Sequence, residues 1–284
     1  MIPLRYLLRF IEEDAPWGDA TSDTVVPDVV CRAQILAKAS GTVAGLSEAR
    51  ALFEHYGVTV MQRTADGRAV SAGTALCDLE GDARSILLVE RTALNIIGRM
   101  SAIATKTRSC VEQARSVSPG TRIAATRKTA PGLRLLDKRA VQLGGGDPHR
   151  FTLSDAVLIK DNHLALVPIG EAVAKARAAS LYRKVEVEVE SADDAAIAAE
   201  AGADILLLDN MTPATVRETI DHLEKRGLRQ GVVIEISGGV TGTTLLEYAR
   251  TGADVISMGA LTHTIENFDV SLEILRGLQT VRLA

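Results

Sequence analysis

The chain has 284 residues, of which 46% are hydrophobic, 3% aromatic and 24% charged, and its formal net charge at pH 7 is -4. This composition is typical of a globular protein with a substantial core, and the length allows either one large α/β domain or two unequal domains. The negative charge and the few aromatic residues argue against nucleic-acid binding, because phosphate contacts need a basic surface and base stacking needs aromatic side chains.

Near the N-terminus, no apolar run reaches the length of a signal core or a membrane span, so we expect a cytoplasmic protein without a membrane partner. Cys31, Cys77 and Cys110 are odd in number and widely separated. They form no CxxC or CxH motif, so neither a disulfide framework nor a zinc site is indicated. Reduced structural thiols are the simplest interpretation.

The first hundred residues predict a small α+β domain. Leu4, Leu7, Leu8 and Ile11 share one helical face, and Pro16 ends that pattern. Further on, three alternating or apolar runs predict strands around one helical stretch. The strands are expected at residues 32–39, 58–63 and 74–79, and the helix at residues 47–55.

A long helix follows, over residues 83–116, for which Asp82 is a suitable N-cap. Arg91 lies on this helix among largely apolar neighbours. An arginine in such surroundings needs a carboxylate or an interface, and the residues alone favour a structural salt bridge.

From residue 121 onward, short apolar runs alternate with helical patterns at intervals of about 20 to 35 residues, which is the rhythm of a parallel α/β fold. The runs are residues 122–125, 156–159, 184–189, 204–208, 232–236 and 254–257. Each is followed or closed by polar or glycine residues, so a barrel with one site at its carboxyl face explains the pattern best. An open Rossmann-like sheet is the alternative, but no GxGxxG follows the first of these strands. Residues 267–283 have largely helical spacing and predict a C-terminal helix that packs on the barrel or on the first domain.

The strongest group of candidate site residues is basic. Arg127 and Lys128 follow the first strand of the second half, and His149 and Arg150 follow the triple glycine at 144–146. Concentrated cations in an acidic protein indicate an anionic small substrate, such as a dicarboxylate or a phosphoester. A solvated basic loop is the alternative.

Further candidates end later strands. Lys160 could neutralise pyrophosphate, form a Schiff base or make only a strand-end salt bridge. Glu188 and Asp209 could hold ribose hydroxyls, a magnesium ion or the charge of a sugar cation. Glu186 and Glu190 share the face of Glu188, and a core salt bridge is as good an interpretation for each of the three.

Glycine-rich turns after the last two strands could grip a phosphate through bare backbone N–H groups. They are Ser237, Gly238 and Gly239 after the fifth strand and Gly259 after the sixth. His263 follows Gly259 and is a weaker candidate.

Taken together, these motifs resemble the quinolinate phosphoribosyltransferase family. The resembling segments are residues 13–14, 18–21, 90–95, 101–105, 126–134, 144–150, 158–163, 186–190, 207–211, 237–239 and 259–263. The resemblance implies a small N-terminal α/β-sandwich domain over residues 1–103. It also implies an incomplete, open, six- to seven-stranded parallel α/β barrel over residues 104–266, with a C-terminal helix at 267–284 packing back on the first domain.

The same resemblance implies an activity in NAD biosynthesis. Quinolinate and phosphoribosyl pyrophosphate would give nicotinate mononucleotide, pyrophosphate and carbon dioxide, with Mg²⁺ accompanying the phosphoribosyl pyrophosphate. The assembly would be a homodimer with shared active sites, either ending there or continuing to a hexamer.

The implied residue roles follow the order of the chain. Arg91 would cross the dimer interface to the quinolinate carboxylates, and Arg127, Lys128, His149 and Arg150 would be the cations of the substrate cavity. Lys160, Glu188 and Asp209 would surround phosphoribosyl pyrophosphate and its magnesium, with Glu188 and Asp209 as the metal ligands, largely through pyrophosphate and water. Ser237, Gly238, Gly239, Gly259 and His263 would bind the 5′-phosphate. The catalytic residues would be Lys128, Lys160, Glu188 and Asp209.

Two residues depart from the family pattern. Ala102 replaces a usual glycine, and Pro148 stands where an asparagine often precedes the His-Arg pair. Neither change removes a charged group. The rival interpretations are the molybdenum-transport-associated paralogues, which tend to lack the lysine and asparagine matching Lys160 and Asn162, a Schiff-base lyase using Lys160, and a non-catalytic anion-binding barrel.

Overall fold

The computed structural model describes residues 2–275 and 280–281, and the chain divides into two compact units. The first contains Met1–Lys106, Leu135–Gly144 and Ile265–Ala284, and the second contains Thr107–Arg134 and Gly145–Thr264. The predicted division into residues 1–103 and 104–266 differs from this one at Leu135–Gly144, which belong to the first unit although they lie within the second predicted range. Neither unit is therefore a continuous stretch of chain.

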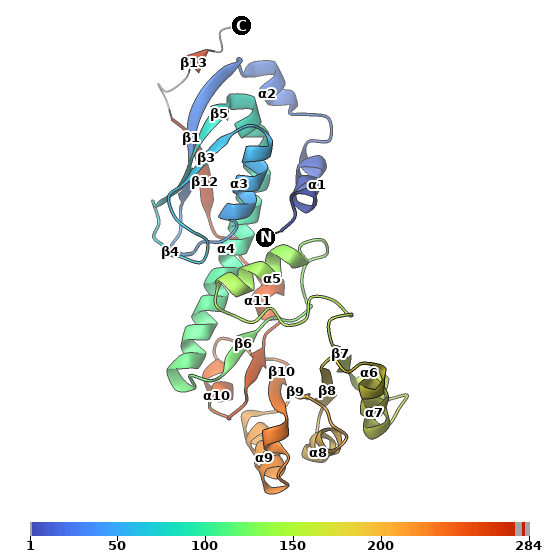
Figure 1. Ribbon diagram of the computed structural model, residues 1–284. Coiled ribbons are helices and arrows are strands. Elements are labelled where there is room, and N and C mark those ends of the chain that lie inside the picture. The colour runs from blue at the N-terminus through green and yellow to red at the C-terminus, as the bar shows by residue number, and fades with distance from the viewer. Residues whose placement is uncertain (1, 276–279, 282–284) are drawn as a thin grey trace. The chain divides into compact units, whose positions relative to one another are not determined.

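The first unit is built on an antiparallel sheet with strand order β12-β1-β5-β3, and β13 (Thr280–Val281) also pairs with β1 (Figure 1). The strands are β1 (Val29–Ala37), β3 (Thr59–Gln62), β5 (Ala75–Asp82) and β12 (Val270–Ile274), with a separate two-stranded sheet of β2 (Gly41–Thr42) and β4 (Ala69–Val70). Its helices are α1 (Leu4–Asp14), α2 (Ala20–Val25), α3 (Leu46–His55) and α5 (Arg134–Leu143). In α1, Leu7 and Ile11 are the buried residues of the predicted apolar face.

The predicted C-terminal helix is wrong at residues 270–274. These residues form β12, which pairs antiparallel with β1 from Ala33↔Ile274 to Ala37↔Val270. Val270, Leu272 and Ile274 alternate with the period of two that a strand requires, and β1 offers a sheet edge whose backbone groups need partners. Residues 280–281 likewise form a strand, β13, rather than a helix, and residues 276–279 and 282–284 of that prediction lie outside the described part of the chain.

The long helix α4 (Ala83–Val117) has 35 residues and contributes to both units. The backbone N–H of Ser85 donates to Asp82 Oδ2 over 2.9 Å, so Asp82 caps the helix as the sequence predicts. Within residues 2–275, no helix combines the length and apolar character needed to span a membrane.

The second unit confirms the incomplete barrel. Its six strands are all parallel and run in the order β6-β11-β10-β9-β8-β7, so the sheet stays open between β6 and β7. The strands are β6 (Arg122–Ala124), β7 (Val157–Ile159), β8 (Val185–Val189), β9 (Ile205–Asp209), β10 (Val233–Ser237) and β11 (Val255–Ser257). The helices and turns between and after them are α6 (Asp161–Leu164), α7 (Ile169–Ala179), α8 (Ala192–Glu200), α9 (Pro213–Lys225), η1 (Arg229–Gly231), α10 (Leu245–Ala249) and α11 (Ala260–His263).

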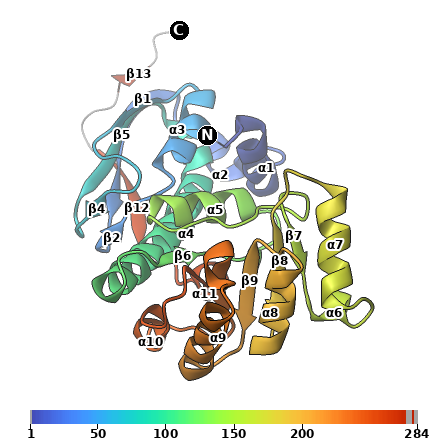
Figure 2. The ribbon, with the colours of Figure 1, turned by 60° about the horizontal axis from the view of Figure 1, so that its bottom comes forward.

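The alternation of valine and glutamate in β8 decides which residues face the helices. Val185, Val187 and Val189 are at most 2% exposed and belong to one core with residues of α8 and α9. Figure 2 shows these helices beside the parallel strands. The intervening glutamates therefore point to the inner face of the sheet, as the sequence predicts.

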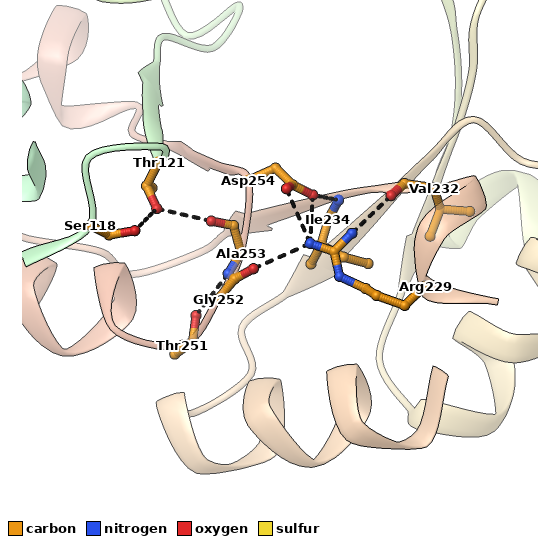
Figure 3. A network of polar contacts seen from close by, with 9 residues as sticks. All are labelled: Ser118, Thr121, Arg229, Val232, Ile234, Thr251, Gly252, Ala253 and Asp254. Atoms are coloured by element: carbon orange, nitrogen blue, oxygen red, sulfur yellow. Dashed lines mark hydrogen bonds and ion pairs between the residues drawn. The ribbon is translucent and has the colours of Figure 1, made fainter. Parts of the chain in front are cut away.

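At the amino ends of the strands, Asp254 connects the segment before β11 to Arg229 and to the start of β10 (Figure 3). The guanidinium of Arg229 donates from Nη2 to both carboxylate oxygens of Asp254, at 3.1 and 3.0 Å, and from Nη1 to the carbonyl of Val232 at 3.0 Å. The backbone N–H of Ile234 donates to Asp254 Oδ2 over 2.7 Å. This carboxylate therefore holds the start of β10 against the start of β11.

The same arrangement occurs two strands earlier, before β9. Gly202, Ala203 and Asp204 precede β9 just as Gly252, Ala253 and Asp254 precede β11. Asp204 Oδ2 accepts the N–H of Val185 over 2.8 Å, and Arg177 donates to the carbonyl of Gly202 over 2.8 Å. The two glycines have φ of 94° and 93°, a conformation that glycine adopts at little cost. The strand starts are thus stabilised by a repeated glycine–aspartate turn.

We expect Asp254→Ala to lower the free energy of unfolding by about 2 kcal/mol, because Arg229 loses its carboxylate partner and the N–H of Ile234 loses its acceptor. Denaturant titration of the variant would measure the loss. The matched control is Asp193→Ala, because 88% of the Asp193 side chain is accessible and its ion pair among the described residues is with His222, at 3.8 Å. Equal unfolding midpoints for the two variants would contradict this role for Asp254.

Candidate active site

A cavity of about 490 Å³ lies at the carboxyl ends of the parallel strands. Its lining residues are Thr126, Arg127, Lys128, His149, Arg150, Leu158, Lys160, Glu186, Leu207, Asp209, Asn210, Glu235, Ser237, Gly238, Gly239 and Ser257. All belong to the second unit, and most follow or end one of its strands. Parallel strands bring residues that are distant in sequence to one edge of a sheet, which is where ligands of α/β folds bind.

The basic loop after β6 is held in place by hydrogen bonds from the side chains of Arg134 and Thr262. Arg134 donates to Thr129 Oγ1 over 3.0 Å and to the carbonyl of Phe151 over 3.2 Å, and Thr262 Oγ1 donates to the carbonyl of Lys128 over 2.8 Å. The side chains of Arg127 and Lys128 stay directed to the cavity. Arg127 Nε is buried and has no hydrogen-bond partner among the described residues. An anion is the natural partner for such a guanidinium.

His149 lies between two buried carboxylates on neighbouring parts of the sheet. Its Nε2 is 3.6 Å from Glu186 Oε2 and 3.4 Å from Glu235 Oε1, and the two glutamates are 2% and 4% exposed. The backbone N–H of Arg150 donates to His149 Nδ1 over 2.8 Å. Both ring nitrogens of His149 therefore face protein groups, so the ring is fixed in one orientation.

The charge of this cluster follows from its burial. Burial is the largest influence and lowers the pKa of His149, but Glu186 and Glu235 together outweigh it and raise the pKa to about 9. Burial also raises the pKa of the Glu186 carboxyl group. The atoms of the three side chains lie within 4.8 Å of one another, which a cation could bridge. Arg127 and Arg150 line the same cavity, so positive side chains can balance the two carboxylates of the cluster without a metal ion.

Burial lowers the pKa of Arg150, and the nearby charge of Arg127 lowers it further. Two guanidinium groups that repel each other inside one cavity are each stabilised by an added anion. The geometry therefore favours an anionic ligand beside Arg127 and Arg150.

Lys160 connects the cavity to β8. Its ammonium group forms an ion pair with the carboxylate of Glu188, and Glu188 is 8% exposed. Glu188 itself lines a separate cavity of about 200 Å³ with Asp161 and Glu190. An ion-paired ammonium is a charged group, not a free amine nucleophile, so this contact favours an electrostatic role for Lys160 over a Schiff base.

Asp209 and the glycine turn after β10 face the cavity together. Asp209 is the register partner of Ser237 across the two parallel strands. Asn210 donates from Nδ2 to Asp209 Oδ2 over 2.6 Å. Gly238 and Gly239 have φ of 90° and 62°, so the turn exposes backbone that carries no side chain.

The predicted site residues divide into three groups by their positions. Those that line the cavity are Arg127, Lys128, His149, Arg150, Lys160, Asp209, Ser237, Gly238 and Gly239. Glu188 reaches it through its ion pair with Lys160, and a side chain on Gly259 would meet Lys128 and His263, so these three residues are neighbours. Arg91 belongs to the first unit, on α4, and is exposed.

Among the charged and amide side chains that line the cavity, three have no site role in the sequence prediction: Glu186, Asn210 and Glu235. A signal existed for Glu235, which interrupts the apolar run Val232–Ile236 and alternates with Ile234 and Ile236 as the glutamates of β8 alternate with valines. Glu186 was recognised as sharing the inner face but not as a partner of His149. Asn210 gave no periodic signal, because it lies just beyond the end of its strand.

Two family patterns cover nearly the whole chain. "Quinolinate phosphoribosyl transferase, N-terminal domain" matches residues 19–101, and "Quinolinate phosphoribosyl transferase, C-terminal domain" matches residues 103–273. The chain belongs to the quinolinate phosphoribosyl transferase family. The predicted family resemblance is thereby confirmed.

Relatives and solved structures of this family agree with that assignment. A protein of Methanothermobacter thermautotrophicus named "Probable nicotinate-nucleotide pyrophosphorylase (carboxylating)" is 49% identical, covering 95% of this chain and 98% of that protein. The nicotinate-nucleotide pyrophosphorylase (carboxylating) of Homo sapiens is 38% identical, over 86% and 82% of the two chains. The structure of the nicotinate-nucleotide pyrophosphorylase from Francisella tularensis superposes with a TM-score of 0.89 at 33% identity, covering 97% of this chain and 98% of that one. The quinolinate phosphoribosyl transferase family thus accounts for both the sequence and the fold.

Proposed function

We propose that this member of the family converts quinolinate and phosphoribosyl pyrophosphate to nicotinate mononucleotide, pyrophosphate and carbon dioxide, as the carboxylating pyrophosphorylases named above are described. The observation that carries the proposal is the cavity: it combines Arg127, Lys128, Arg150 and Lys160 with the backbone of a glycine turn. Both proposed substrates are multiply charged anions, and such a site stabilises them and the pyrophosphate that leaves.

Each group in the cavity has a physical task in this reaction. Arg127 and Arg150 would hold the two quinolinate carboxylates and so aim the ring nitrogen at the sugar carbon that carries the pyrophosphate. Lys128 and Lys160 would neutralise the phosphate oxygens as the bond to pyrophosphate breaks. The same cations would stabilise the ring carbanion that remains when carbon dioxide leaves. Ser237, Gly238 and Gly239 would receive the 5′-phosphate through backbone N–H groups.

Mg²⁺ is proposed as the metal of the reaction. Glu188 and Asp209 offer the carboxylate oxygens that this ion prefers, and Lys160 and Asn210 already fix both side chains. Mg²⁺ in such sites is bound through one or two carboxylates, water and substrate phosphates, and when bound it neutralises the pyrophosphate. These residues therefore fit the ion.

The deciding assay incubates purified protein with quinolinate, phosphoribosyl pyrophosphate and Mg²⁺ and follows nicotinate mononucleotide and carbon dioxide. A parallel reaction contains nicotinate in place of quinolinate. Product from quinolinate alone is the expected result. Absence of product in both reactions, from folded protein, would overturn the proposal and favour the transport-associated paralogues.

We also propose a cytoplasmic homodimer, or a hexamer built from such dimers, in which Arg91 of one subunit completes the site of its partner. Arg91 is exposed in the single chain although its helix is largely apolar around it, as expected of a residue that meets a ligand across an interface. Size-exclusion chromatography with light scattering would give the oligomeric state.

Arg91→Ala is expected to lower kcat/KM for quinolinate about a hundredfold, because a charge-assisted contact to a carboxylate is lost, while the unfolding midpoint stays unchanged. Mixing Arg91→Ala with Lys160→Ala subunits tests the sharing directly. Each mixed dimer would contain one intact site, so activity should rise well above that of either variant alone. A mixture no more active than its components would contradict the shared site.

A further inference from the structure

Asn210 adopts a left-handed backbone conformation that few non-glycine residues take, although asparagine takes it more readily than most. Its φ is 54°, and within residues 2–275 only His149 among the other non-glycine residues has a positive φ. A positive φ at a residue with a β-carbon is uncommon outside glycine and is frequent at functional sites. The contacts of Asn210 show what the conformation achieves.

Asn210 connects two parts of the cavity that come from different strands. Its backbone N–H donates to the carbonyl of Ser237 over 3.0 Å, which extends the β9–β10 pairing by one step beyond Asp209↔Ser237. Its side-chain Nδ2 donates to Asp209 Oδ2 over 2.6 Å. One residue thus contacts both the candidate metal carboxylate and the start of the phosphate turn.

The packing around Gly238 depends on the same residue. A β-carbon on Gly238 would collide with Asn210 Oδ1 and would lie 2.8 Å from the backbone nitrogen of Asn210. Gly238 also has a φ of 90°, which disfavours any other residue. The turn therefore fits closely around the amide of Asn210.

We propose that Asn210 is a positioning residue that fixes the Asp209 carboxylate relative to the Ser237–Gly239 turn, so that the two ends of magnesium-bound phosphoribosyl pyrophosphate are held at once. The inference rests on the proposed function and extends it. Asn210 acts through Asp209 and the turn, so its loss should weaken the binding of this substrate and leave quinolinate binding intact.

Asn210→Gly tests the role of the side chain most directly, because glycine accepts the positive φ and only the side chain is lost. We expect the KM for phosphoribosyl pyrophosphate to rise about tenfold, as for the loss of one charge-assisted hydrogen bond, and the KM for quinolinate to stay within about twofold. Asn210→Asp keeps the size and tolerates the same φ, but it places a carboxylate against Asp209, so the effect should be larger. Asn267→Gly, at an exposed position of the first unit, controls for the added glycine.

Calorimetric titration of the protein with phosphoribosyl pyrophosphate and Mg²⁺, without quinolinate, provides a readout independent of turnover. Weaker binding by both Asn210 variants at unchanged unfolding midpoints is the expected result. Wild-type affinity in Asn210→Asp, or an equal rise of both KM values, would overturn the inference. A wild-type protein that neither binds nor turns over phosphoribosyl pyrophosphate would instead overturn the proposed function.

Discussion

Lys160→Ala is expected to lower kcat/KM about a hundredfold, because the change removes a cation from the cavity and also leaves Glu188 without its ion-pair partner. Glu188 is 8% exposed, so its carboxylate would then repel an anionic substrate from a poorly solvated position. Steady-state kinetics with each substrate varied in turn would measure the loss.

The matched control for this variant is Lys175→Ala. Lys175 also forms an ion pair with a glutamate, Glu171, but both side chains are more than half exposed on α7. Exposed pairs contribute little, so Lys175→Ala should keep nearly full activity. The double variant Lys160→Ala with Glu188→Gln should be more active than the product of the two single losses predicts, because the unpaired charge is gone. A kcat/KM of Lys160→Ala within about threefold of wild type would rule out this role.

Arg99→Ala should cause the largest loss of stability, about 3 to 5 kcal/mol, because it leaves the Asp137 carboxylate buried and uncompensated. Arg99 donates from Nε and Nη2 to the two carboxylate oxygens of Asp137, at 2.7 and 2.8 Å. Asp137 is fully buried, at 0% exposure. Denaturant titration followed by circular dichroism would measure the change.

Two further variants compare the stability contribution of the buried Arg99–Asp137 pair with that of an exposed ion pair. Arg32→Ala breaks a contact with Glu80 in which both side chains are about half exposed, so it should cost less than about 1 kcal/mol. Arg99→Met with Asp137→Leu removes both charges and should recover most of the lost stability. If Arg99→Ala unfolds at the same denaturant concentration as Arg32→Ala, the pair does not stabilise the first unit.

Most of the second unit could be predicted from its sequence. Its strands read as apolar runs because both faces are covered, and the polar residues after them mark the edge where the cavity lies. The first unit was harder to predict at its C-terminal strand. Val270, Leu272 and Ile274 satisfy a strand pattern, but Phe268 and Leu275 also complete a helical one, and only the partner strand β1 decides between them.

Some site residues could not be predicted from the sequence, for a similar physical reason. Arg127 and Lys128 were visible because two adjacent cations after an apolar run are uncommon in a structural role. Glu235 and Asn210 matter through residues far along the chain, His149 and Ser237, and no local pattern reports such a contact. Long-range pairing also explains why the excursion of α5 into the first unit could not be read from its own helical spacing.

Because α5 belongs to the first unit, neither unit is encoded by one continuous segment of the gene. The chain leaves the second unit after Arg134 and returns at Gly145, directly between the segments that carry Lys128 and His149. A fragment of residues 107–264 would therefore expose α5, including Asp137 and Lys138, without the partners it has in the first unit. A fragment lacking α5 would need a new linker between two cavity-lining segments. Expressing either unit alone would therefore require a redesigned connection at α5.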